Sequence, residues 1–263
     1  MTLENDRKVN PQFSISNFQS SIFNPPQACA KTTRMIWTKT RTMLGFLRHP
    51  LAADRSETHG AIFVLWIDGV GCFWISLTER VTVGGPGSPS SKPPHPREVA
   101  DVAILSDLKR RHATIVRTGE GYLLEALGAA RVAGRDVLDR ATLADGALIE
   151  LGRSVQWRIR QPSALSVSAR LDFISDHRPT QAVDGLVMLA DTCLLGPGDE
   201  NHIVCSDWPG QVLLVRQQDE LWCRSRLDLT VNGDRLGNGK RLRSGDVVSG
   251  EDIRFRIEER GHE

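Results

Sequence analysis

Apolar and polar residues alternate along two similar segments, one in the middle of the chain and one near its C-terminal end. In SVQWRIR (154–160) and DIRFRIE (252–258), apolar side chains such as Trp157 and Phe255 occupy every second position, and most of the residues between them are charged. Because successive side chains of a strand point to opposite faces, this pattern predicts antiparallel strands buried on one face. Elsewhere after Ala61, short apolar runs are separated by Gly, Asp, Asn or Pro, which is typical of strands joined by tight turns. The sequence shows no long helical stripe there and predicts an all-β fold.

The strand pattern occurs twice. When the chain is aligned with itself, several segments match in one register, and a single-residue slip extends the match to QWRIR with RFRIE. Further upstream, VTVGGPG corresponds to CLLGPG, and the first copy carries an extra loop, GSPSSKPPHPRE, of the kind that belongs on a surface. Self-similarity of this kind indicates a duplicated unit. The other matching pairs are IVRTGEGYLLEA with LVRQQDELWCRS, RVAGRDV with TVNGDRL, and LADGALI with LRSGDVV.

Many short strands spaced by turns suggest β-sandwiches, and we expect two of them in tandem, over residues 61–162 and 184–260. We expect residues 163–183 to form a linker or a shared strand. The strand is an option because SALSVSARLDF retains some apolar alternation. Residues 1–60 are rich in Asn, Gln, Ser, Thr and Pro without a sustained period, so we expect a largely disordered or mis-assigned N-terminal extension. The alternative is a functional arm, because KTTRMIWTKTRTMLGFLRH has the pattern of a short basic amphipathic helix.

Charge and cysteine content narrow the function classes. The 33 basic and 32 acidic side chains leave a net charge of +1, so no global field draws the chain to nucleic acid or to an anionic membrane, and any anion site must be local. The stretch AIFVLWIDGVGCFWI is too short and too interrupted for an integral membrane segment, and it predicts strand, turn, strand. The five cysteines are odd in number and well separated, which predicts reduced thiols, no metal site and a cytoplasmic location.

The order of the motifs resembles that of the forkhead-associated (FHA) domain over roughly residues 68–259, more closely in the first copy than in the second. The shared order is a strand that ends in Gly, an Asp-containing strand, a basic pair before His-Ala, a Val-(Asn)-Gly hairpin, and Leu-x-x-Gly-Asp before an isoleucine strand. The first copy shows these elements as VTVGG, ADVAILSDLKRRHATIVR, RVAGRDV and LADGALIELG. The second copy retains LLGPG, TVNGDRL and LRSGDVVSGEDIRFRIE.

The resemblance implies a module that binds phosphothreonine peptides through the loops at one end of the sandwich. Its usual contacts are an Arg after the first strand's Gly, a Ser three residues before the His, and an Asn in a later loop. In the first copy, Gly85 stands at the Arg position, Lys109 stands at the Ser position, and the shortened loop 128–130 lacks the Asn. In the second copy, Pro197 replaces the Arg and the Ser-x-x-His is missing, so we expect no phosphate site there.

The candidate phosphopeptide-binding residues are three consecutive cations of the first copy, Lys109, Arg110 and Arg111, which supply positive charge and donors on one loop. The alternative is a surface turn whose charged side chains are hydrated and bind no ligand. We expect His112 to be packed and hydrogen-bonded to nearby backbone, so that it braces this loop. Further structural support is expected at tight turns, namely from Gly84, Gly85 and Gly134 in the first copy and from Asn232 and Gly233 in the second.

The sequence contains no recognisable catalytic signature, and its histidines are scattered, so we expect a non-catalytic protein without a cofactor or a metal. We predict a protein-binding module whose first copy recognises a phosphothreonine-containing partner. The first alternative is a phosphate-independent scaffold of degenerate FHA-like domains. The second alternative, an unrecognised enzyme, has the least support.

Overall fold

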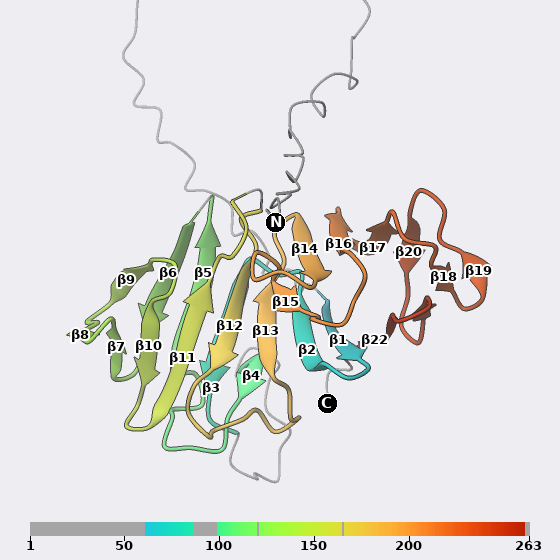
Figure 1. Cartoon of the computed structure of the whole chain (residues 1–263). Coiled ribbons are helices and arrows are strands. Elements are labelled where there is room, and N and C mark those ends of the chain that lie inside the picture. Colours follow the sequence, from blue (N-terminus) through green and yellow to red (C-terminus); the bar gives the residue numbers. More distant parts are fainter. Residues whose placement is uncertain (1–60, 87–98, 120, 165, 261–263) are drawn as a thin grey trace, which may run out of the picture. The chain divides into compact units, whose positions relative to one another are not determined.

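The fold was obtained as a computed structural model, which describes residues 61–86, 99–119, 121–164 and 166–260. The predicted N-terminal extension, 1–60, lies outside the described residues. The described residues belong to one compact unit and consist of strands, turns and loops, with no helix among them (Figure 1). The all-β class predicted from the alternating segments is therefore confirmed, and the membrane-like stretch at its start forms a strand, a turn and a strand.

One large sheet runs through both repeats. It has twelve strands of two to six residues, and the two outermost strands have only two residues each. In spatial order the strands are β19 (Asp234–Arg235), β18 (Thr230–Val231), β21 (Val247–Ser249), β22 (Arg254–Glu259), β1 (Ile62–Ile67), β2 (Gly71–Ser76), β13 (Gly185–Met188), β12 (Ala169–Phe173), β11 (Val155–Arg160), β10 (Leu148–Leu151), β7 (Ala130–Val132) and β8 (Arg135–Asp136).

Two smaller sheets of five strands complete two β-sandwiches, and both sheets have the same order of equivalent strands. In the first repeat the order is β4 (Val102–Ala103), β3 (Arg80–Gly84), β5 (Ala113–Thr118), β6 (Gly121–Ala126) and β9 (Arg140–Leu143). In the second repeat it is β15 (Ile203–Val204), β14 (Thr192–Gly196), β16 (Val212–Gln217), β17 (Glu220–Ser225) and β20 (Lys240–Leu242).

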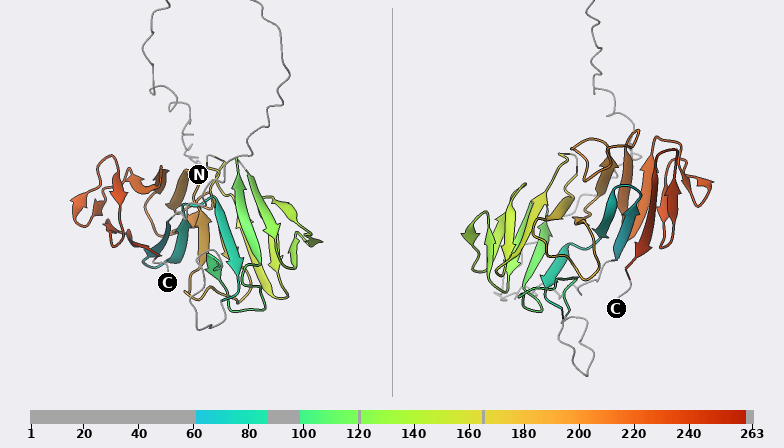
Figure 2. Two further views of the ribbon diagram at one scale, coloured as in Figure 1. Left: turned by 180° about the vertical axis from the view of Figure 1, so that it is seen from behind. Right: turned by 60° about the horizontal axis from the view of Figure 1, so that its bottom comes forward.

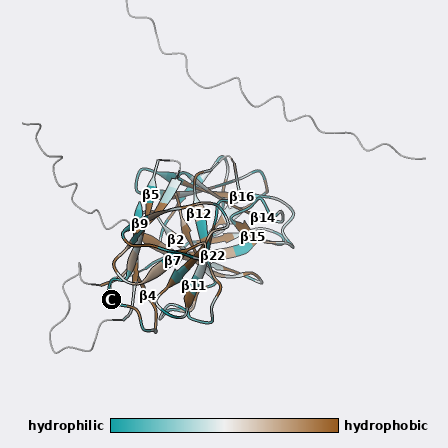
Figure 3. Ribbon diagram, turned by 90° about the vertical axis from the view of Figure 1, so that its left-hand side faces the viewer, coloured by the Kyte–Doolittle hydropathy of each residue, from teal (hydrophilic) through white to brown (hydrophobic). Residues whose placement is uncertain are grey.

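The sandwiches have separate hydrophobic cores on opposite faces of the large sheet. On β2, Trp74 belongs to the core of the first small sheet, whereas its neighbours Phe73 and Ile75 belong to the core of the second. The same alternation occurs on β13 at Leu186 and Val187, as the two-residue period of a strand requires. Figure 2 shows β1 and β2 in teal between the two repeats, and Figure 3 shows the apolar residues, in brown, concentrated along the strands.

The strand pairing does not follow the sequence order of the repeats. The hairpin β1–β2 precedes the first repeat, yet β1 pairs antiparallel with β22, the last strand of the second repeat. The strands β12 and β13 precede the second repeat, yet β12 pairs with β11, the last strand of the first. Each sandwich is thus completed by strands that lie before the other repeat, and β2 and β13 pair in parallel where they meet. Residues 163–183 include β12, and the domain boundaries at 61–162 and 184–260 stay a prediction.

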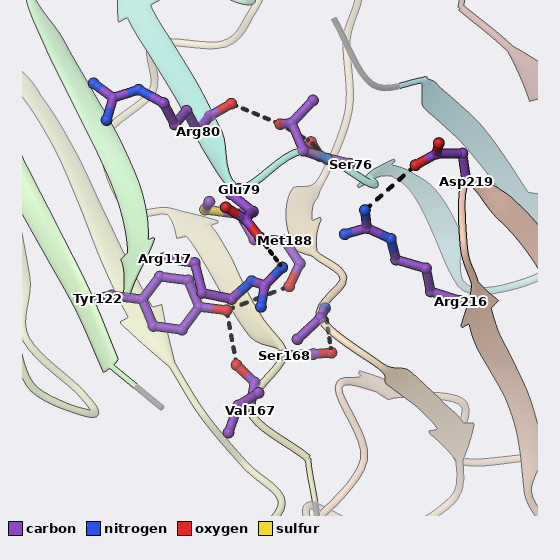
Figure 4. Close-up of polar contacts among 12 residues, drawn as sticks. Ser76, Glu79, Arg80, Arg117, Tyr122, Val167, Ser168, Met188, Arg216 and Asp219 are labelled. Carbon is purple, nitrogen blue, oxygen red and sulfur yellow. Dashed lines mark hydrogen bonds and ion pairs between the residues drawn. The ribbon is translucent and has the colours of Figure 1, made fainter. Parts of the chain in front are cut away.

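The short connections that lead out of the exchanged strands are held in equivalent ways. Residues 77–79 link β2 to β3, and the Arg117 N–H donates to the Glu79 carbonyl at 2.8 Å. Residues 189–191 link β13 to β14, and the Arg216 N–H donates to the Asp191 carbonyl at 2.8 Å. Figure 4 shows the side chains of both arginines with their carboxylate partners.

A buried tyrosine fixes the chain just before β12. The Tyr122 hydroxyl, on β6 of the first repeat, donates to the Val167 carbonyl at 2.8 Å (Figure 4). Burial raises the pKa of this hydroxyl, so it stays protonated and able to donate. The neighbouring Ser168 hydroxyl accepts a hydrogen bond from the Ala190 N–H at 2.9 Å. The segment just before β12, which returns the chain to the first sandwich, is therefore held by hydrogen bonds to the backbone of Val167 and to the side chain of Ser168.

Candidate functional site

The three candidate cations lie on the loop between β4 and β5, residues 104–112, at the end of the first sandwich where β3 finishes and β5 begins (Figure 1). Lys109 and Arg110 are exposed, and Arg111 is half-buried. The structure therefore presents positive side chains from one short loop, and the backbone of that loop determines where they lie.

Two glycines let this loop lie directly on the end of β3. A Cβ atom placed on Gly84 would lie 1.9 Å from the carbonyl oxygen of Arg110, and one on Gly85 would lie 2.6 Å from that of Leu108. The Gly85 N–H also donates to the Lys109 carbonyl at 2.8 Å. Any side chain here would collide with the loop backbone, so an arginine at position 85 is incompatible with this position of the loop.

His112 ties the cationic loop to the turn between β6 and β7. Its ring is 3% exposed, accepts a hydrogen bond at Nδ1 from the Lys109 N–H at 3.1 Å, and has Nε2 2.8 Å from the Ala129 carbonyl. An accepting Nδ1 leaves the proton on Nε2, which then donates to that carbonyl. The backbone carbonyl of His112 accepts from the N–H groups of Leu127 and Gly128 at 2.8 and 2.9 Å. One side chain and its own backbone thus join two loops.

Two side chains of the loop have partners on neighbouring turns. The Lys109 Nζ donates to the Leu127 carbonyl at 2.6 Å, which holds this ammonium group beside the turn between β6 and β7. The carboxylate of Asp107 forms an ion pair with Arg153, with 3.7 Å between Oδ2 and Nε. Arg153 was not among the candidates, because no spacing in the sequence connects it with the loop.

The remaining turn positions are hairpin corners. Gly134 has φ of 75° and follows Ala133 at 49°, and Asn232 and Gly233 have φ of 54° and 88°. Two successive residues with positive φ are typical of the tight turns that join paired strands. The Asn232 side chain is used locally, since its Oδ1 accepts from the Val247 N–H at 2.9 Å.

A second buried histidine, His202, lies in the second repeat between β14 and β15. Its Nδ1 accepts from the Leu194 N–H at 3.1 Å, and its Nε2 is 3.2 Å from the Ser168 carbonyl, just before β12. Burial lowers the pKa of this imidazole, with a smaller contribution in the same direction from the nearby Arg170 guanidinium. A neutral ring held between two backbone groups joins the second repeat to the strands that complete the first.

The described cysteines show no sign of reactive or metal-binding chemistry. Cys72, Cys193, Cys205 and Cys223 are buried free thiols, and burial raises the pKa of Cys72 to about 12. Within the part of the chain that the structure describes, no group of three or more His, Cys, Asp or Glu side chains could hold a metal ion. The same part contains no helix that could span a bilayer.

Comparisons with known proteins give structural neighbours only. No family model matches the chain, and no curated protein matches it. The FHA domain of the CT664 protein from Chlamydia trachomatis is 27% identical, with 35% of this chain and 89% of that chain covered and a TM-score of 0.24. The FhaA FHA domain, solved in complex with the intracellular domain of Rv3910, is 27% identical, with 34% and 91% covered and a TM-score of 0.23.

The N-terminal FHA domain from EssC, a component of the bacterial Type VII secretion apparatus, spans more of the chain. It is 13% identical, with 75% of this chain and 90% of that chain covered and a TM-score of 0.21. All three neighbours are FHA domains. This is the family that the sequence motifs resemble.

Proposed function

We propose that this chain is a non-catalytic protein-binding module whose first sandwich binds a phosphothreonine-containing partner through Lys109, Arg110 and Arg111. The observation that carries the proposal is the fixed backbone of the cationic loop. It rests on Gly84 and Gly85, and it is tied through His112 to the neighbouring turn. A phosphate group needs positive charge and several donors in one place, and this loop supplies both.

A fixed loop favours binding because less conformational entropy is lost when the ligand arrives. The net charge of the whole chain is only +1, so attraction of a phosphate depends on this local cluster and not on a general field. The second repeat has Pro197 at the position of the family's Arg and lacks a comparable run of cations, so we assign the phosphate site to the first repeat alone.

The competing proposal is a phosphate-independent scaffold. Its support is the twelve-stranded sheet, which joins both repeats through paired strands and gives the molecule a continuous frame. The absence of the family's Arg at Gly85 also favours it, since that Arg would be a principal phosphate contact in the family. For either function we propose a cytoplasmic location, with the free thiols as its support.

A phosphothreonine peptide library, passed over the full chain, separates these proposals. We expect phosphorylated peptides to be retained and Arg110→Ala to abolish retention, because charge-assisted hydrogen bonds to phosphate are lost. The matched control is Arg254→Ala, which removes an exposed arginine from the second sandwich. Equal retention of the unphosphorylated library would contradict phosphate recognition and favour the scaffold.

A further inference from the structure

The turn between β10 and β11, residues 152–154, packs against the cationic loop. A Cβ atom placed on Gly152 would lie 2.9 Å from Oδ1 of Asp107 and 3.0 Å from Cδ2 of Leu108. The Gly152 N–H donates to the Ala129 carbonyl at 2.9 Å, and His112 Nε2 lies 2.8 Å from the same carbonyl. Three loops therefore meet at one end of the first sandwich: 104–112, 127–129 and 152–154.

Arg153 brings a further cation to this meeting point. Its side chain is 93% exposed, that of Asp107 is 43% exposed, and the two are joined by the ion pair of 3.7 Å. Such a long, solvated ion pair adds little to stability and is easily broken. A competing anion of higher charge therefore has access to the guanidinium group.

The second repeat shows that the turn does not need this cation for its fold. The equivalent turn has Gly250 in place of Gly152 and Glu251 in place of Arg153, and it connects β21 to β22 just as 152–154 connects β10 to β11. Gly250 is also packed closely, with a Cβ atom there 2.5 Å from Leu229 Cδ2. In both repeats the glycine lets the turn pack closely against a neighbouring segment, whereas the residue after it is a cation in the first repeat and an anion in the second.

We propose that Arg153 is a fourth phosphate-binding cation of the site formed by Lys109, Arg110 and Arg111, and that Asp107 is the anion it releases when the phosphate binds. This inference rests on the proposed function. The carboxylate carries one negative charge, whereas a phosphorylated threonine carries about −1.5 to −2 and offers three acceptor oxygens to the arginine fork. Asp107 in the free protein holds Arg153 beside the loop and competes with the incoming phosphate.

The test measures the Kd of a labelled phosphothreonine peptide, recovered from the library on the full wild-type chain, with its unphosphorylated form as a blank. We expect Arg153→Ala to weaken binding about 5- to 20-fold, since a charge-assisted contact is lost, and Arg153→Lys to weaken it less. We expect Asp107→Asn to tighten binding about 2- to 5-fold, because a competing charge is removed. In the Arg153→Ala background, Asp107→Asn should have much less effect, since the two act on each other.

The outcomes separate this inference from the function on which it rests. If Arg110→Ala abolishes binding while Arg153→Ala leaves the Kd unchanged, the role of Arg153 is overturned and the proposed function stands. If Asp107→Asn tightens binding equally with and without Arg153, the release of Asp107 is overturned. If the wild-type chain binds both forms of the peptide equally, the proposed function fails and this inference fails with it. Unchanged thermal unfolding of each variant shows that the fold is intact, as the exposure of Arg153 predicts.

Discussion

At the scale of single residues, the candidate site is defined by close contacts to glycine rather than by the charged side chains. Gly84, Gly85 and Gly128 each lie so near another group that no Cβ atom fits without a shift. At Gly84 and Gly85 that group is loop backbone, and at Gly128 it is the ring of His112. Backbone yields less readily than a flexible side chain, so these contacts fix the loop on which the cations lie.

We expect Gly84→Ala to destabilise the protein by about 1–3 kcal/mol or more, because the new methyl group would force the loop away from β3. Gly121→Ala is the matched control, since the nearest atom to a Cβ there is the Thr118 carbonyl oxygen at 3.9 Å. Thermal and denaturant unfolding of both variants gives the measurement. A Gly84→Ala variant as stable as Gly121→Ala would show that the loop is not held by this contact.

At the scale of elements, the main feature is the exchange of strands between the repeats. The last strands β11 and β22 have similar alternating sequences, so both offer an equivalent edge to an incoming hairpin. Register is specified by which face is buried, but the two-residue period does not specify the edge with which a strand pairs. The choice of partner is therefore made by packing beyond the strand itself.

The exchange predicts that a mutation in either hairpin mainly destabilises the repeat that does not follow that hairpin in sequence. Leu65 of β1 is fully buried in the second core, and Leu171 of β12 is fully buried in the first. We expect either leucine→Ala variant to cost about 2–5 kcal/mol through loss of buried surface and cavity formation. In hydrogen-exchange mass spectrometry, Leu65→Ala should lower protection mainly in β16 and β17, and Leu171→Ala mainly in β5 and β6. The opposite assignment would show that each hairpin stays with the repeat that follows it.

At the scale of the whole molecule, two cores share one sheet, so the repeats in sequence are not the sandwiches in space. The first core takes Leu171, Phe173, Leu186 and Met188 from the strands that precede the second repeat. A fragment cut at the repeat boundary lacks these side chains and leaves β11 without its neighbour. Folding of the first sandwich is therefore expected to depend on residues beyond 162.

Two fragments test this expectation. We expect residues 80–190, which contain β3 to β13, to unfold cooperatively, though less stably than the whole chain because Val64 and Trp74 are missing from the core. We expect residues 61–162 to show no cooperative transition. Circular dichroism during urea titration gives the comparison. Cooperative unfolding of 61–162 together with an unfolded 80–190 would refute the dependence.

The candidate site was predictable in part. Three adjacent cations before a histidine are visible in the sequence, because they are neighbours along the chain. The ion pair between Asp107 and Arg153 was not, since these residues lie on separate loops whose contact depends on how the turns of two sheets meet. The need for glycine at position 85 could not be predicted either, because it comes from the short distance between this residue and the backbone of another loop.

The sequence by itself determined the strand period, the duplication and the positions of the tight turns, because these depend on side chains that are close along the chain. Only the tertiary structure decided which hairpin completes which sandwich and which loops share the cationic end. The physical reason is that a two-residue period fixes the face that a strand buries but not the edge with which it pairs. That edge is chosen by contacts between residues far apart in sequence, such as β1 with β22.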